Sequence, residues 1–221
     1  MLKAVIFDMD GVIIDSEPLH HQAYNNMFKE IGIKVSETLY ESFTGQSTIN
    51  ICTKLCAHFN IDAPPEALVA LKRKHYKRFF EHDSSLKLIN GVLDLIQHYH
   101  EHGLTLVLGS SASMEGINLV FERFNLNPYF KAKLSGADLK ASKPHPEIFE
   151  KAAKASGHKP NECMVIEDST NGIKAAKAAG IFSVAYDSFH SKNQDYSEAN
   201  MVITDFKAIY LDNMSNIFQH N

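Results

Sequence analysis

The chain has 221 residues, of which 44% are hydrophobic and 22% charged, and its formal net charge at pH 7 is −4. These values are typical of a folded globular protein with one large domain, or with one domain that carries a smaller insertion. The acidic balance gives no electrostatic reason to expect nucleic acid or an anionic membrane as a partner, and no apolar stretch approaches the roughly 20 residues that span a bilayer.

The N-terminal stretch predicts a buried strand followed by a helical segment. Residues 3–10, KAVIFDMD, form a short continuous apolar run that closes on acidic residues, as parallel strands buried on both faces do. Residues 16–86 then show helical periodicity with no convincing strand, most clearly in 18–32, 48–60 and 65–82. We interpret 16–86 as a helical insertion that caps the carboxyl edge of the sheet, where ligands bind in open α/β folds.

After one predicted helix, strand and helix patterns alternate from Leu104 to the end of the chain. Further strands are predicted within 104–111, 163–168 and 182–187, and weaker ones within 132–138 and 201–206. Helices are predicted within 91–103, 114–126, 145–157 and 171–180. This alternation predicts an α/β fold, a doubly wound parallel sheet of Rossmann-like type. The core is predicted to comprise 1–15 and 87–221, with the small helical cap domain 16–86 inserted between them.

Two aspartates follow the first predicted strand directly. Asp8 and Asp10 are two residues apart in an extended segment, so their carboxylates can face the same spot at the strand's end. Like charges this close either share a proton or hold a cation between them, and Mg²⁺ is the hard cation that carboxylates and phosphates usually share. A turn or a helix start is the alternative explanation, because aspartate is common in both.

Other residues that carry chemistry close the later strands. Glu167 and Asp168 end one predicted strand, and Ser110 and Ser111 end another. Hydroxyls and free backbone N–H groups at the start of a helix can form a phosphate cradle. Lys143 lies in a loop between two predicted elements. Taken one at a time, the acidic pair and the serines are equally well explained as helix caps, and the lysine as a solvated surface residue.

The order of these motifs resembles the haloacid dehalogenase superfamily of aspartate-nucleophile phosphotransferases. Its four motifs match DMDGV at 8–12, SSAS at 110–113, SKPHP at 142–146 and IEDS at 166–169, so the resemblance covers essentially the whole chain. The long helical stretch after the first motif looks like the four-helix cap of the subgroup that includes beta-phosphoglucomutase. The ordered combination is far more specific than any one motif.

The resemblance implies a role for each motif residue. Asp8 would attack phosphorus and carry an aspartyl-phosphate, and Asp10 would act first as the general acid and then as the general base. Mg²⁺ would bind Asp8, the backbone carbonyl of Asp10 and Asp168, with Glu167 as a further contributor. Lys143 would neutralise the phosphoryl group and the nucleophile.

The substrate-binding residues are less sharply defined. Ser111 aligns best with the motif hydroxyl that binds the phosphoryl oxygens, with Ser110 as the alternative. His20 and Lys74 fall where the mutase subgroup has cap residues that engage the sugar phosphate, although a solvated helical face explains both equally well. Thr48 stands where beta-phosphoglucomutases carry an arginine that holds the second phosphate, and its lack of a guanidinium removes that clamp.

We therefore predict a Mg²⁺-dependent phosphatase that hydrolyses a small phosphorylated metabolite, for example a sugar phosphate, with beta-phosphoglucomutase activity as the alternative. A glycosyltransferase that uses DxD would not explain the ordered serine, lysine and acidic motifs. A non-catalytic binding protein is expected to have lost Asp8, Asp10 or the lysine. Three cysteines, an odd number, and an N-terminus without a signal-peptide pattern favour a cytoplasmic protein, which we expect to be a monomer.

Overall fold

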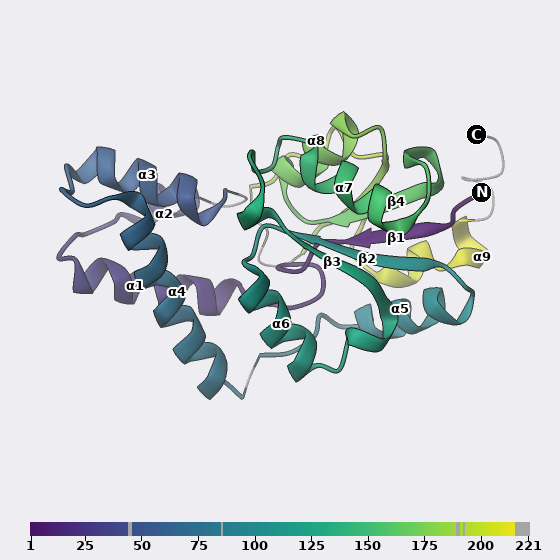
Figure 1. Cartoon of the computed structure of the whole chain (residues 1–221), viewed down its shortest axis with the longest axis horizontal. Helices are drawn as coiled ribbons and strands as arrows, with labels where there is room; N and C mark the ends of the chain where they lie inside the picture. Colours follow the sequence, from purple (N-terminus) through teal and green to yellow (C-terminus); the bar gives the residue numbers. More distant parts are fainter. Residues whose placement is uncertain (44–45, 85, 189–190, 192, 215–221) are drawn as a thin grey trace. The chain divides into compact units, whose positions relative to one another are not determined.

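The computed structural model describes residues 1–43, 46–84, 86–188, 191 and 193–214 (Figure 1). The chain divides into two compact units, one formed by Met1–Asp15 with Lys87–Asn221 and the other by Ser16–Leu86. Within the described ranges, no helix is both long and apolar enough to cross a membrane.

The first unit is built on a parallel sheet with the strand order β3-β2-β1-β4-β5-β6. The strands are β1 (Ala4–Phe7), β2 (Thr105–Ser110), β3 (Phe130–Ser135), β4 (Cys163–Glu167), β5 (Phe182–Tyr186) and β6 (Met201–Ile203). β1 is central, with Phe7 in register with Leu108 of β2 and Ile166 of β4. The doubly wound parallel sheet predicted from the sequence is confirmed, and both weaker strand candidates belong to it.

Helices cover both faces of this sheet. They are α5 (Val92–Glu101), α6 (Met114–Arg123), α7 (Glu147–Ser156), α8 (Thr170–Ala178) and α9 (Leu211–Met214), with short 3-10 helices at Asn127–Tyr129, Gly136–Asp138, Pro160–Glu162 and Phe206–Ile209. Figure 1 shows α7 and α8 on one side of the sheet and α5, α6 and α9 on the other. Ile6 packs in the cluster that contains Phe149 of α7, whereas the next residue, Phe7, packs against Tyr99 of α5. Alternate residues of β1 therefore face the two helical layers, which explains its continuous apolar sequence.

The carboxyl ends of the central strands meet at one edge of the sheet. The backbone N–H of Asp8 donates to Ile166 O at 3.0 Å, which extends the pairing of β1 and β4 by one residue. Ser110 ends β2 on the other side of β1, and Glu167 ends β4. Polar residues that are far apart in the sequence are thus placed side by side by the parallel topology alone.

The second unit contains α1 (Glu17–Glu30), α2 (Glu37–Glu41), α3 (Thr48–Phe59) and α4 (Pro65–His82). Its helices pack around a separate apolar core composed of Tyr24, Met27, Phe28, Phe43, Ile51, Cys52, Leu55, Leu68 and Val69. Cys52 belongs to this core, and the Cys56 thiol donates to Ala63 O at 3.6 Å. Because this unit buries its own apolar side chains, it does not depend on the sheet for a hydrophobic interior.

The chain leaves the first unit and returns to it at neighbouring points. The N–H of Asp15 donates to Lys87 O at 3.3 Å, and the N–H of Ile89 donates to Ile13 O at 2.9 Å. Gly11 has a φ of +80°, which allows the turn after β1 to fold back on itself. An insertion whose two ends are hydrogen-bonded to each other adds a second unit without interrupting the sheet.

Candidate active site

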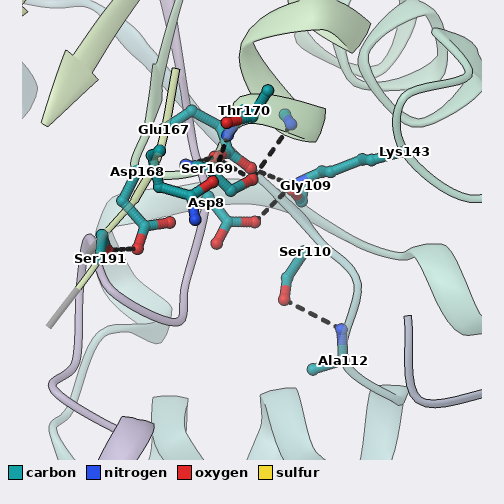
Figure 2. A network of polar contacts seen from close by, with 12 residues as sticks. Asp8, Gly109, Ser110, Ala112, Lys143, Glu167, Asp168, Ser169, Thr170 and Ser191 are labelled. Atoms are coloured by element: carbon teal, nitrogen blue, oxygen red, sulfur yellow. Dashed lines mark hydrogen bonds and ion pairs between the residues drawn. The ribbon is translucent and has the colours of Figure 1, made fainter. Parts of the chain in front are cut away.

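Lys143 is the centre of a buried polar network at the carboxyl edge of the sheet (Figure 2). Its ammonium group donates to Asp8 Oδ1 at 2.6 Å, Glu167 Oε1 at 2.7 Å and Gly109 O at 3.1 Å. The residue is only 7% exposed, and its Nζ lies 4.8 Å from the centroid of the Phe149 ring. All three ammonium protons therefore have acceptors, and the charge is held in one place.

Two carboxylates contact this ammonium group, and a third lies close to them. Asp8, Glu167 and Asp168 each offer an oxygen, and these oxygens lie within 4.8 Å of one another. Glu167 accepts from Lys143 through Oε1, and from the backbone N–H and the hydroxyl of Ser169 through Oε2, at 2.7 and 2.9 Å. Because both oxygens of Glu167 already accept hydrogen bonds, its geometry suits an anchor for Lys143. Asp8 and Asp168 are better placed to face a ligand.

Burial and mutual repulsion disfavour the ionised forms of the carboxylates and so raise their pKa values. Burial, together with the negative charge of Glu167, raises the pKa of Asp8 to about 7 although Lys143 opposes the shift. Burial, with the charges of Glu167 and Asp8, also raises the pKa of Asp168 well above 3.8. Burial alone would lower the pKa of Lys143, but the two carboxylates that it contacts outweigh this effect and raise it. The lysine therefore stays charged, whereas the two aspartates favour their protonated forms in the absence of further positive charge.

The chemistry of this donor set fits Mg²⁺. The cluster offers carboxylate oxygens only, which hard divalent cations prefer over nitrogen and sulfur ligands. Asp10 is half-buried in the turn after β1, where it forms an isolated bridge with Ile14, and its charge contributes to the raised pKa of Asp8. The Asp10 side chain is thus close enough to Asp8 to affect its pKa. The sequence predicts that Asp10 binds the metal through its backbone carbonyl.

The two candidate serines have different environments. Ser110 is the last residue of β2 and fully buried, and its Oγ accepts from the N–H of Ala112 at 3.1 Å (Figure 2). Ser111 is exposed. A Cβ at Gly136 would lie 3.1 Å from Ser110 O and 3.2 Å from Ser111 Cα, so this glycine lets the end of β3 approach the serine turn closely. Ser110 therefore shapes the turn, and Ser111 is the more accessible of the two serines.

The predicted cap residues His20 and Lys74 belong to the helical unit, and the structure does not pair them. His20 Nδ1 lies 2.6 Å from the Nζ of Lys72, and the His20 ring stacks on Tyr76 with centroids 4.6 Å apart. Lys72 is buried, and its ammonium group also lies 5.0 Å from the Tyr24 ring centroid. Lys74 is exposed on the same helix. Lys72 is therefore the lysine of α4 that His20 contacts, and the substrate-binding role expected for Lys74 stays a prediction.

Several residues that shape the site were not singled out from the sequence. A Cβ at Gly172 would collide with the Glu167 carboxylate, and a Cβ at Gly11 would collide with the Asp168 carboxylate. Ser191 and Tyr196 donate hydrogen bonds to Asp168 from the segment after β5. A glycine inside a helical pattern, as at 172, is a usable sequence signal because it usually has a packing reason. The polar segment after β5 offers no comparable signal.

The fold and the site define an α/β enzyme core with a lysine-bridged carboxylate cluster at the carboxyl edge of a parallel sheet. Residues 5–186 match the family described as haloacid dehalogenase-like hydrolases, and the chain belongs to this family. The resemblance expected from the four ordered motifs is thereby confirmed, and the chain is an enzyme of this family.

Relatives of the chain include phosphatases and a mutase. It is 31% identical to a phosphorylated carbohydrates phosphatase of Thermotoga maritima over 192 residues, which cover 87% of this chain and 88% of that protein. It is 29% identical to hexitol phosphatase B of Escherichia coli, with 93% and 91% of the two chains covered. Its structure is similar to that of a beta-phosphoglucomutase from Clostridium difficile, with a TM-score of 0.85, 25% identity, and coverage of 99% and 97%.

Proposed function

We propose that this enzyme is a Mg²⁺-dependent phosphatase that hydrolyses a small phosphorylated metabolite of the sugar-phosphate class. The observation that carries the proposal is the buried contact between Lys143 and Asp8, at 2.6 Å, with Asp168 beside it. A buried ammonium group next to an acid that follows a parallel strand provides charge where a phosphoryl group needs it. The phosphatases among the relatives support this substrate class.

Asp8 is the proposed nucleophile. One of its oxygens bonds to phosphorus while the bond from phosphorus to the leaving alcohol oxygen breaks, and Asp10 gives its proton to that oxygen. Asp10 then takes a proton from water, the water oxygen bonds to the phosphorus, and the acyl phosphate bond to Asp8 breaks. The products are the alcohol and inorganic phosphate, and Asp8 and Asp10 return to their starting states.

The other residues of the site bind and orient the phosphoryl group. Lys143 offsets the negative charge of the phosphoryl oxygens and of Asp8, and Glu167 keeps its ammonium group in place. Ser111 donates its hydroxyl to a phosphoryl oxygen, with Ser110 as the alternative. Mg²⁺, held by Asp8, the backbone carbonyl of Asp10 and Asp168, would supply positive charge that lets a carboxylate and a phosphate approach each other.

The helical unit 16–86 is proposed to act as a cap that selects the substrate. The candidate substrate-selecting residues are His20 and Lys74, together with Lys72, whose ammonium group lies against aromatic rings and beside His20. Thr48 begins α3 and is hydrogen-bonded to Tyr24, so it engages the helical unit's own core. A threonine cannot provide the bidentate grip on a second phosphate that a mutase needs.

The decisive experiment measures two products from a set of phosphorylated sugars and sugar alcohols with Mg²⁺, including beta-glucose 1-phosphate with and without its bisphosphate activator. We expect release of free phosphate from at least one of these substrates. Glucose 6-phosphate that accumulates faster than free phosphate would establish the mutase, which the similarity to a beta-phosphoglucomutase keeps as the second candidate. Inactivity toward every member, and toward a generic aryl phosphate, would overturn the proposal.

A further inference from the structure

Two neighbours restrict the carboxylate of Asp168. Gly11 lies so close to Oδ2 that a Cβ there would collide with it. The hydroxyl of Ser191 donates to the same oxygen, and Figure 2 shows the second oxygen of Asp168 on the side of Asp8. Ser191 is itself buried, at 7% exposure. The side chain of Asp168 therefore has little freedom to rotate away from the acidic cluster.

The segment after β5, which contains Ser191, also holds the backbone around Asp168. The hydroxyl of Tyr196 donates to Asp168 O at 2.7 Å. The N–H of Thr170 donates to Gln194 Oε1 at 2.8 Å, and the N–H of Asp195 donates to Thr170 Oγ1 at 2.7 Å. The turn that joins β4 to α8 is thus tied to the segment after β5 at three points besides the carboxylate. We call this set of residues the Asp168 clasp: Ser191, Gln194, Asp195 and Tyr196.

These contacts resemble the outer contacts of known metal sites. A ligand carboxylate binds tightly when its second oxygen is hydrogen-bonded and its rotamer is fixed, because less conformational freedom is lost on binding. The clasp provides both effects, since Ser191 bonds one oxygen and Tyr196 fixes the backbone that carries the side chain. Neither residue belongs to the network around Lys143, so neither needs to touch the reacting atoms.

We propose that the Asp168 clasp is a positioning device that sets the affinity of the acidic cluster for its divalent cation. This inference rests on the proposed function, because it assumes that Asp168 is a metal ligand. Ser191 and Tyr196 are positioning residues: they act through Asp168 and not on the phosphoryl group. Their loss should weaken metal binding about tenfold, at the lower end of what such outer contacts contribute.

The test measures Mn²⁺ binding to the full-length chain by electron paramagnetic resonance, with Ser191→Ala and Tyr196→Phe as the test variants. Ser84→Ala is the matched serine control, because Ser84 is exposed and belongs to the helical unit 16–86. Tyr210→Phe is the matched tyrosine control, because the Tyr210 ring stacks on His98, away from the clasp. We expect the Kd for Mn²⁺ to rise about tenfold in each test variant and to stay within about twofold of wild type in both controls.

A second measurement separates positioning from general structural support. The Mg²⁺ concentration for half-maximal turnover should rise with the Mn²⁺ Kd, and kcat at saturating Mg²⁺ should return to near the wild-type value. Test variants with a lower melting temperature but an unchanged Mn²⁺ Kd would overturn the proposal. If wild type and controls bind no Mn²⁺, the metal site of the proposed function fails, and the clasp's role fails with it. Binding by wild type with unaffected test variants overturns the clasp alone.

Discussion

At the scale of single residues, the buried charges of the site lower the stability of the folded chain. Lys143 and Glu167 are almost fully buried, and so is Asp8, although taking such groups out of water costs several kcal/mol each. Their mutual contacts at 2.6 and 2.7 Å offset part of this cost. An apolar cluster of equal volume would stabilise the sheet edge at least as well. The arrangement is therefore better explained by the need for a preorganised positive charge beside a carboxylate.

The first prediction concerns the proposed nucleophile. Asp8→Asn should lower turnover about a thousandfold or more, because an amide cannot form the acyl phosphate. The fold should persist, since the asparagine retains an oxygen that can accept from Lys143. Turnover of the best substrate and the far-UV circular dichroism spectrum are the measurements. Asp94→Asn, on the exposed face of α5, is the control and should leave both unchanged. Turnover within tenfold of wild type would contradict the nucleophile assignment.

The second prediction separates the two serines. Ser111→Ala should lower kcat/KM about a hundredfold, the usual effect of removing one hydrogen-bond donor to developing charge. Ser110→Ala should lower the free energy of unfolding by about 1 kcal/mol, because the half-buried N–H of Ala112 loses its acceptor. Steady-state kinetics and urea unfolding of both variants provide the comparison. If Ser110→Ala produces the larger kinetic defect, the phosphate-binding role belongs to Ser110.

At the scale of helices and strands, two helices begin in the same way but differ in what lies beside them. α6 and α8 each follow a serine whose Oγ accepts from the N–H of a glycine at the third helical position, at 3.4 Å for Gly116 and 3.1 Å for Gly172. A Cβ at Gly116 would make an ordinary 3.6 Å contact with Ser113 Oγ. A Cβ at Gly172 would collide with the Glu167 carboxylate.

The third prediction compares alanine substitutions at these two glycines. Gly116→Ala should raise the free energy of unfolding by about 0.5–1 kcal/mol, because alanine restricts the unfolded chain and favours the helix. Gly172→Ala should lower it by about 1–3 kcal/mol through overpacking, and should also lower turnover because Glu167 anchors Lys143. Chemical denaturation of both variants tests this. An equal stabilisation of both would show that the close approach of Glu167 to α8 has no energetic consequence.

Much of the sheet was predictable because its elements are locally encoded. Apolar runs that end on polar residues identified the strands, and parallel pairing then requires Asp8 and Glu167 to meet at one edge. The buried residues of the helical unit were harder to predict, because this requires knowing which face of each helix points toward the core. Lys72 follows buried Leu68 by four residues and so lies on the same face of α4, whereas Lys74 lies on the exposed face. Helical periodicity could therefore have separated the buried Lys72 from the exposed Lys74.

The contacts of the Asp168 clasp could not be predicted from local patterns. Ser191 and Tyr196 follow β5, and they meet Asp168 because β5 is paired with β4 in parallel register. Nothing in the local sequence around this serine and tyrosine indicates that they contact Asp168. The same is true of Gly109, whose carbonyl oxygen accepts from Lys143. Such contacts depend on how connections fold over the sheet edge, which hydrophobic periodicity does not determine.

At the scale of the whole molecule, two units share one continuous chain. The sheet unit contains the acidic cluster, and the unit 16–86 has its own core. The pairing of Asp15 with Lys87 brings the two connections together, so the segment between them is free to vary without altering β1. The insertion can therefore change without altering the strand that leads to Asp8, and the relatives of the chain include both phosphatases and a mutase.

The last prediction concerns the competition between protons and Mg²⁺ for the carboxylates of Asp8 and Asp168. The pKa of Asp8 rises from 3.8 to about 7 on folding, and that of Asp168 also rises. Between pH 3.8 and about 7, Asp8 binds more protons in the folded chain than in the unfolded chain, so it destabilises the fold as the pH rises through this range. Asp168 acts in the same direction. A cation that binds the deprotonated carboxylates removes this penalty. Stabilisation by Mg²⁺ should therefore be larger at pH 8 than at pH 5.5.

At pH 8, Mg²⁺ at 100 times its Kd should contribute about 2.7 kcal/mol, which corresponds to a rise in melting temperature of about 5–10 °C. At pH 5.5 the rise should be markedly smaller, because protons occupy the same oxygens. Thermal melts with Mg²⁺ and with EDTA at both pH values give the difference directly, and the other titrating groups cancel in it. Asp168→Asn should lose the Mg²⁺ effect at both pH values. An equal Mg²⁺ effect at the two pH values would mean that the cation does not bind through Asp8 and Asp168.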